Sequence, residues 1–128
     1  MALNGYKMND VGVGAYQDLN NDSGATLVQG EFTVIGELFA MLTDGADLAA
    51  GSVGGFDIGK KKVRTTSFVT GESTFATVNG IVYFDPTNKA FSDTETDGYY
   101  EVGQLLAAKG SASYIEFVTF DRAVLVVT

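Results

Sequence analysis

The chain has 128 residues, enough for one domain with its own core, and it contains neither Cys nor His. The lack of Cys excludes disulfides and thiolate metal sites, and the lack of His removes the usual general base at neutral pH. The formal net charge of −8 argues against a nucleic-acid partner, because neutralising phosphates requires clustered Lys and Arg. The sequence shows neither a secretory signal nor an apolar run of membrane length, so we expect a protein made in the cytoplasm that has no membrane partner.

The first ten residues differ from the rest of the chain. Residues 1–10 contain few apolar side chains and no clear period, which predicts a flexible N-terminal arm before a single β domain at residues 11–128. Leu3, Tyr6 and Met8 could anchor such an arm in a neighbouring protein, where an extended segment pairs with an exposed sheet edge. The alternative is a disordered terminus without a role. In both cases we expect removal of residues 1–10 to leave the stability of the folded body almost unchanged.

The first half of the predicted domain alternates between short apolar runs and turn residues. Gly36-Glu37 separates two apolar runs and predicts a two-residue hairpin turn of type II′. The second run, Leu38 to Leu42, also fits a helical spacing, but its five residues favour a strand. Asp47 to Gly51 is expected to form a loop with one buried leucine. The strands expected in this half cover residues 11–15, 25–28, 31–35, 38–42 and 52–58.

A basic run follows at Lys60, Lys61, Lys62, Val63 and Arg64, and it holds half of the eight basic residues. We favour a solvated strand at a sheet edge, because lysines commonly protect such edges from pairing with other chains. The alternative is an electrostatic contact with an acidic partner surface, which makes the four cationic residues candidates for binding.

The segment from Gly80 to Phe91 reads GIVYFDPTNKAF and predicts a β-hairpin. Ile81 to Phe84 is apolar on both faces, which is typical of an inner strand covered on both sides. Pro86 is the single proline of the chain, and it stands in the turn Asp85 to Asn88, where its fixed φ suits a tight reversal.

The C-terminal part predicts two further strands, at residues 99–107 and 113–120, with Asp121-Arg122 interrupting the pattern before the apolar run Ala123 to Val127. That run would promote aggregation if exposed, so we expect it to be paired or buried. In total the sequence predicts eight to ten short strands. The predicted fold class is therefore all-β, a small β-barrel or β-sandwich.

A search for catalytic or metal-binding groups identifies one pattern of interest. Asp93, Glu95 and Asp97 alternate as the oxygen ligands of calcium can, but the surrounding sequence lacks the glycine and the closing glutamate of an EF-hand loop. A serine nucleophile would lack a histidine base, and neither a G-x-S-x-G motif nor a phosphate-binding loop occurs. We therefore expect no enzyme activity, no catalytic residues, no cofactor and no bound metal.

Two stretches resemble the tailed-bacteriophage capsid decoration (capsid cement) protein family, a small all-β head-stabilisation domain found in phage head operons. The first runs from Gly24 to Phe56 and includes the corner Asp47-Leu48-Ala49-Ala50-Gly51. The second combines VYFDPTNKAF, Val82 to Phe91, with YYEVGQLLAA, Tyr99 to Ala108. The similarity spans about residues 11–120.

The resemblance implies a β protein that binds the outer surface of an icosahedral head and stabilises contacts between major capsid protein subunits. Members act as dimers or trimers and have no catalytic residues to carry over. The candidate capsid-binding residues are Leu3, Tyr6, Met8, Lys60, Lys61, Lys62 and Arg64. We expect the chain to reside on the virion, with the major capsid protein as partner. The alternatives are a carbohydrate-binding or fibre-type β module of a phage virion, or a tail or baseplate component.

Overall fold

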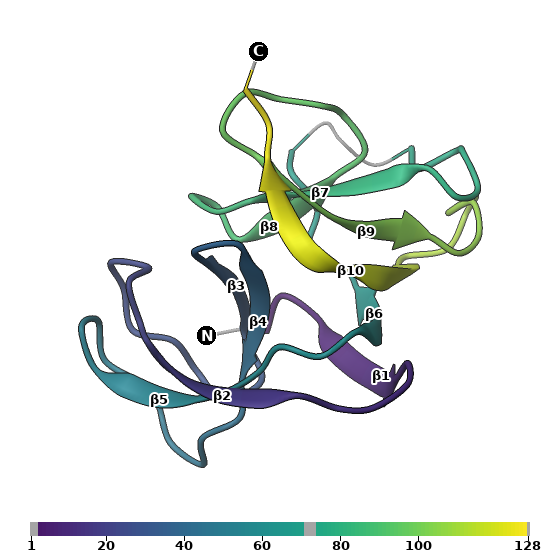
Figure 1. The fold of residues 1–128 in the computed structure, drawn as a ribbon. Helices are drawn as coiled ribbons and strands as arrows, with labels where there is room; N and C mark the ends of the chain where they lie inside the picture. The colour runs from purple at the N-terminus through teal and green to yellow at the C-terminus, as the bar shows by residue number, and fades with distance from the viewer. Residues whose placement is uncertain (1–2, 71–73, 128) are drawn as a thin grey trace.

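The computed structural model describes residues 3–70 and 74–127, and within them the chain is all-β (Figure 1). None of the described segments forms a helix of the length and apolarity that crossing a membrane requires. The strands are β1 (Tyr6–Asp10), β2 (Tyr16–Asn20), β3 (Phe32–Ile35), β4 (Leu38–Leu42), β5 (Val53–Asp57), β6 (Lys61–Thr65), β7 (Ile81–Asp85), β8 (Ala90–Ser92), β9 (Tyr100–Leu105) and β10 (Ile115–Leu125).

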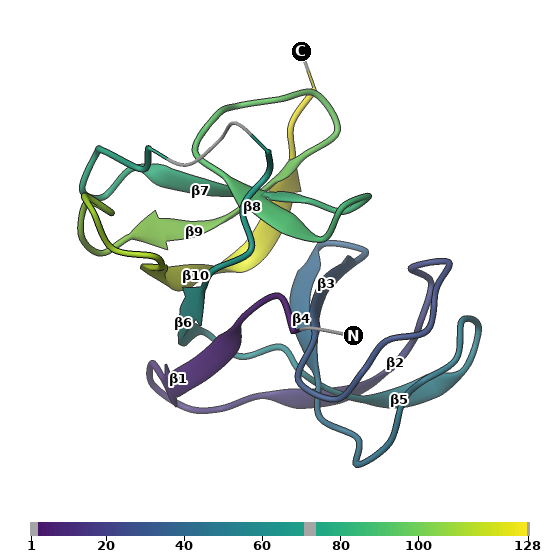
Figure 2. The same cartoon turned by 180° about the vertical axis from the view of Figure 1, so that it is seen from behind.

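The strands form two antiparallel sheets, one in the order β1-β6-β10-β9-β7-β8 and the other in the order β2-β5-β4-β3. A bent two-stranded ribbon joins them, because β1 and β2 run consecutively alongside β6 and β5 (Figure 1 and Figure 2). At the bend, Val11 N donates to Lys60 O and Ile58 N donates to Ala15 O, each at 2.9 Å. Gly59 lies at this crossing, where an added Cβ would stand 2.8 Å from the backbone nitrogen of Ala15. Strands that pass from one sheet to another through such bends are a common way to build a corner.

Phe39 of β4 joins the two sheets through the main core. Its ring centroid lies 5.2 Å from that of Phe32, 5.5 Å from that of Phe84 and 6.0 Å from that of Phe91. Aromatic pairs at these separations add packing energy to the area that they bury. Apart from Phe32 and Phe75, which lies in the loop before β7, the other buried residues of this core come from the six-stranded sheet. A second, mainly aliphatic cluster covers the other face of the four-stranded sheet and contains Leu27, Ile35, Ala40, Leu42, Leu48 and Phe56.

The hairpins predicted from turn chemistry are confirmed. β7 pairs with β8 on one side and β9 on the other, so it is an inner strand. Asp85 Oδ1 accepts a hydrogen bond from Thr87 N at 2.9 Å, which is the local bonding that makes aspartate favourable in turns. Gly36 has φ of +61° in the two-residue connection between β3 and β4, as a II′ turn requires at its first position.

The prediction of a flexible N-terminal arm is wrong from Asn4 onward. Residues 6–10 form β1, which pairs with β6, and residues 1 and 2 lie outside the described residues. The buried side chain of Asn4 bonds both backbone groups of Phe32, each at 2.9 Å. The Asn4 amide thus supplies hydrogen-bond partners to the backbone of β3, an edge strand of the other sheet, and it connects the N-terminal segment to the rest of the domain.

Three further expectations are corrected. The first predicted strand, residues 11–15, is the bend between β1 and β2, and Val13 is 92% exposed there. The basic run is not a sheet edge, because β6 lies between β1 and β10. Asp121 and Arg122 do not end a strand, since β10 continues to Leu125 through an irregularity that shifts its register with β9.

Candidate protein-binding surface

The pairing of β1 with β6 brings two sets of predicted binding residues together. Tyr6 stands opposite Arg64 and Asn9 opposite Lys62 in the register of the two strands. Because alternate residues of a strand point to opposite faces, these side chains share the solvent side of the sheet. We call this surface the outer face. It consists of Tyr6, Asn9, Lys62, Arg64, Tyr114 and Glu116, together with the exposed Met8 at the β-bulge just before Asn9.

An ion-pair network fixes the centre of the outer face. Arg64 Nε donates to Glu116 Oε2 at 2.8 Å, and Lys62 Nζ lies 3.5 Å from Glu116 Oε1. The bond to Arg64 lowers the pKa of the Glu116 carboxyl, and the same bond raises the pKa of the Arg64 guanidinium. Glu116 therefore stays ionised and holds both cationic side chains across the boundary between β6 and β10.

Aromatic and sulfur-containing side chains surround this network. The Arg64 guanidinium carbon lies 4.0 Å from the centroid of the Tyr114 ring, a cation–π contact. Tyr6 is 49% exposed, and Met8 stands at the β-bulge where the register between β1 and β6 shifts. Tyr, Met and Arg are the residue types that enrich protein interfaces, because they combine large contact area with polar groups.

A hollow of about 120 Å³ adjoins the outer face at the end of β1. Leu3, Tyr6 and Arg64 line it together with Gly5, the last threonine of β6 and the threonine that follows it. The exposed Leu3 side chain therefore lies beside the tyrosine and the arginine rather than on a separate arm. The hollow has room for one side chain of a partner.

Lys61 does not belong to this surface, although it was a candidate for binding. Its side chain is fully buried on the opposite face of β6, 3.4 Å from Asp57 Oδ1, and it donates to the Gly59 carbonyl. Lys7 Nζ contacts the other oxygen of the buried Asp57 at 2.9 Å. Burial lowers the pKa of Lys61, whereas the bond to Asp57 raises the pKa of Lys7. These three residues form a charged junction that connects β1, β5 and β6.

Lys60 lies just before β6, exposed, with its carbonyl bonded to Val11 N at the bend. Five of the seven candidate residues therefore lie at the outer face or at the hollow beside it: Leu3, Tyr6, Met8, Lys62 and Arg64. Lys60 lies nearby, whereas Lys61 is buried on the opposite face of β6. The sequence reasoning missed Tyr114 as a member. The alternation Tyr114, Glu116 before and within β10 places them on one face, and that signal was available in the sequence.

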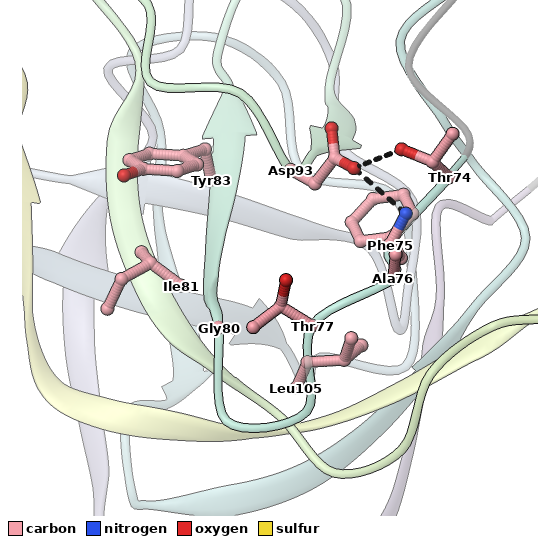
Figure 3. Close-up of a pocket in the computed structure, with 9 residues that line it drawn as sticks. All are labelled: Thr74, Phe75, Ala76, Thr77, Gly80, Ile81, Tyr83, Asp93 and Leu105. Atoms are coloured by element: carbon pink, nitrogen blue, oxygen red, sulfur yellow. Dashed lines mark hydrogen bonds between the residues drawn. The ribbon is translucent and has the colours of Figure 1, made fainter.

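A separate pocket of about 390 Å³ opens where the chain enters β7 (Figure 3). It is lined by Thr74, Phe75, Ala76, Thr77, Gly80, Ile81, Tyr83, Asp93 and Leu105. Figure 3 shows Asp93 directed at Thr74 and at the backbone of Phe75, which donate to one carboxylate oxygen at 2.6 and 2.8 Å. Phe75 has φ of +39°, a conformation that bulky residues rarely adopt. The carboxylate thus holds a strained segment in place.

Asp93 is also the first residue of the pattern Asp93, Glu95 and Asp97, considered above as calcium ligands. Because the Asp93 carboxylate accepts bonds from the loop before β7, it helps to position that loop. Among residues 3–70 and 74–127, three or more carboxylates do not come together in a group that could hold a metal ion. Burial, together with the nearby Glu95 and Glu101, raises the pKa of the phenol of Tyr83, which lines the same pocket.

Comparison with known proteins returns no relative for this chain: no family model matches it, and neither a curated protein nor a solved structure is significantly similar.

Proposed function

We propose that this chain is a capsid decoration protein, which binds the outer surface of a tailed-phage head through the outer face of β1, β6 and β10. The observation that supports the proposal is the composition of that face. It places Tyr6 opposite Arg64 on a rigid sheet, with the exposed Met8 two residues further along β1, and sheets position binding groups more accurately than loops do. The sequence resemblance to capsid decoration proteins supplies the class of partner.

The outer face suits a protein partner because its polar groups are already ordered. Glu116 and Tyr114 restrict the guanidinium of Arg64 before any partner arrives, so less side-chain entropy is lost on binding. Arg64 and Tyr6 border the hollow beside Leu3, which can receive a side chain of the capsid protein. The acidic remainder of the chain favours solubility on a crowded shell.

Binding to heads tests this assignment. Heads of the virus that encodes the chain, assembled without it, are mixed with purified parent, Tyr6→Ala or Arg64→Ala protein and sedimented. Both variants should need at least about tenfold more protein for half-saturation, since truncation of an interface anchor removes about 2 kcal/mol. Tyr16→Ala is the matched control, because Tyr16 is 62% exposed on β2 of the other sheet. Equal binding by all four proteins would exclude the outer face as the surface that binds the capsid.

The stabilising role needs a second measurement. Electron microscopy of heads assembled with and without the chain should reveal closed shells in both cases, and shells without it should rupture at lower temperature or under milder osmotic stress. Heads that fail to form without the chain would instead identify it as a scaffold or an integral shell subunit.

The exposed tyrosines Tyr6 and Tyr114 also favour a second candidate, a carbohydrate-binding module of a virion fibre, because sugar rings stack on aromatic side chains. Binding of the parent on a glycan array, lost on Tyr114→Ala, would support that function in place of capsid decoration. A tail or baseplate component would assemble into rings that the same microscopy would detect.

A further inference from the structure

The chain contains two Asn-Gly dipeptides, Asn4-Gly5 and Asn79-Gly80, and the structure places them in different environments. Glycine has no side chain to shield its backbone nitrogen, so this nitrogen can reach the side-chain carbonyl carbon of the asparagine before it. Every other asparagine of the chain precedes a residue that carries a side chain. The two dipeptides are therefore the places where an asparagine amide is most open to attack by its own backbone.

The Asn4 amide is fixed inside the domain. The residue is 5% exposed, and its Nδ2 donates to Phe32 O at 2.9 Å and to Lys89 O at 3.2 Å. Its Oδ1 accepts a hydrogen bond from Phe32 N at 2.9 Å. These bonds must break before the amide carbon can turn toward Gly5 N. Asn4 can therefore react only from a locally opened form of the chain, and buried, hydrogen-bonded segments open rarely.

Asn79 lies in the exposed turn that leads into β7. Gly80 N donates to Thr77 O at 3.0 Å, which closes this four-residue turn. The hydrogen bonds of Asn79 involve its backbone, because its N donates to Leu105 O at 2.8 Å and its carbonyl accepts from Gln104 Nε2 at 3.3 Å. Among residues 3–70 and 74–127, none bonds to its exposed side chain. The Asn79 amide can therefore turn toward Gly80 once the turn bond opens.

The fold itself favours this reactive dipeptide. Asn79 has φ of +65°, in the left-handed region that asparagine tolerates better than most residues. At Gly80 an added Cβ would stand 2.9 Å from Thr77 O, so a larger residue would clash with the turn. The geometry that makes Asn-Gly suitable for the turn therefore also places an exposed amide beside an unshielded backbone nitrogen.

We propose that Asn79 is a site of spontaneous deamidation and isoaspartate formation in the folded protein. Gly80 N loses its proton to solvent and attacks Asn79 Cγ with its electron pair. The bond from Cγ to Nδ2 then breaks, and ammonia leaves with a proton from solvent, which closes a succinimide ring.

Water opens this ring in one of two ways. Cleavage between Gly80 N and Cγ gives aspartate, whereas cleavage between Gly80 N and the backbone carbonyl carbon of residue 79 gives isoaspartate. Each product has a carboxylate in place of the amide and makes the chain more negative. The reaction takes place within one chain, so the inference does not depend on a capsid partner.

Isoaspartate at this position would alter the start of β7. Asn79 N donates to Leu105 O, and Leu105 N donates to Gly80 O at 2.9 Å, so one backbone bond lies on each side of the peptide that changes. Isoaspartate adds a methylene group to the backbone between residues 79 and 80, and the two bonds cannot both keep their geometry. Thr77, Gly80 and Leu105 also line the pocket shown in Figure 3. The new carboxylate would therefore arise next to that pocket.

Peptide mass spectrometry compares the two dipeptides within one sample. The purified chain is incubated at mildly alkaline pH, folded or unfolded in guanidinium chloride, and then digested with trypsin. The peptide Met1 to Lys7 contains Asn4, and the peptide Thr65 to Lys89 contains Asn79, which fragmentation distinguishes from Asn88.

Deamidation makes a peptide heavier by about one dalton, and the isoaspartate and aspartate forms elute separately. In the folded protein this gain should be at least about tenfold faster at Asn79 than at Asn4, because Asn4 must first break its hydrogen bonds. In the unfolded chain the two rates should be similar. A rate at Asn79 that is no faster than at Asn4 in the folded protein would overturn the proposal.

Asn79→Gly is the matched variant, because glycine adopts the positive φ of this position and has no amide to lose. After the same incubation, the converted parent should melt about 4 °C lower than the fresh parent, since a backbone bond to Leu105 is lost. The variant should keep its melting temperature and show no gain of mass in the peptide Thr65 to Lys89. A gain of mass in the variant, or a converted parent that melts as the fresh parent does, would refute the assignment.

Discussion

Lys61 and Lys62 are adjacent in β6, yet the structure places them in opposite environments. The inner face of the strand buries Lys61 against Asp57 at the junction of the two sheets. The outer face carries Lys62 and Arg64, which pair with Glu116 while remaining in contact with solvent. The difference teaches that a run of like charges can serve two purposes, because strand alternation sends neighbours to opposite faces.

The two faces should respond differently to mutation. A buried charge that loses its partner retains the full cost of desolvation, whereas an exposed ion pair is largely replaced by water. Changes at the junction should therefore alter stability, and changes on the outer face should alter binding.

Deletion of residues 1–10 should have the largest effect. It removes β1, the Asn4 amide that bonds to β3, and Lys7 from the junction. We expect the melting temperature to fall by more than about 10 °C, since breaking a buried ion pair alone removes about 3–5 kcal/mol and each kcal/mol shifts a domain of this size by about 4 °C. Calorimetry of the truncated chain checks this. An unchanged melting temperature would restore the interpretation of these residues as an arm.

Asp57→Asn should be the most destabilising single change of the comparison. It leaves the buried Lys61 and the partly buried Lys7 without their shared carboxylate, at an expected loss of about 3 kcal/mol or more. Urea unfolding measures this free energy. Asp121→Asn, an exposed carboxylate of β10, is the control and should change it by less than about 0.5 kcal/mol. If both variants lost a similar free energy of unfolding, burial would not be what makes the Asp57 carboxylate more important for stability than an exposed one.

Arg64→Ala should leave the melting temperature nearly unchanged while reducing binding to heads. The side chain is about one-third exposed, and its partner Glu116 keeps the contact with Lys62 after the truncation. Calorimetry and head binding on the same preparation separate the two effects. A melting temperature that falls as far as that of Asp57→Asn would mean that the outer face stabilises the fold rather than binding a partner.

Glu116→Gln should have the smallest effect, and it should appear at acidic pH. Arg64 lowers the pKa of Glu116 in the folded state, so its stabilisation is present above the ordinary pKa of a glutamate and is lost as the pH falls through the lowered value. The variant should lack this part of the acid dependence, a difference of a few tenths of a kcal/mol for a solvent-screened pair. The check is a series of melting temperatures measured from neutral to acidic pH. If the melting temperatures of parent and variant fell by the same amount on acidification, the stabilising role of the Glu116–Arg64 pair would be contradicted.

Much of the fold could be predicted because its signals are local. The turn at Asp85 to Asn88, the Gly36 connection and the alternation around Glu116 each depend on a few neighbouring residues, and the structure confirms them. The candidate site was predicted in part. The residues were chosen because their types are common in protein interfaces, and five of the seven lie together at the outer face or its border. Their proximity could not be predicted, because β1 and β6 are about fifty residues apart.

The sequence alone determined the all-β class, the hairpins and the absence of Cys and His, since composition and turn chemistry act over short range. The tertiary structure decided that residues 6–10 form a strand, that Lys61 is buried and that β10 continues past Asp121. Two of these depend on a partner distant in the chain, β6 for the N-terminal segment and β9 for the end of β10. The burial of Lys61 depends on how the two sheets meet at the bend, although its partner Asp57 lies only four residues before it. Strand pairing supplies backbone hydrogen bonds to almost any sequence that reaches a free edge, so side-chain patterns hold little information about it.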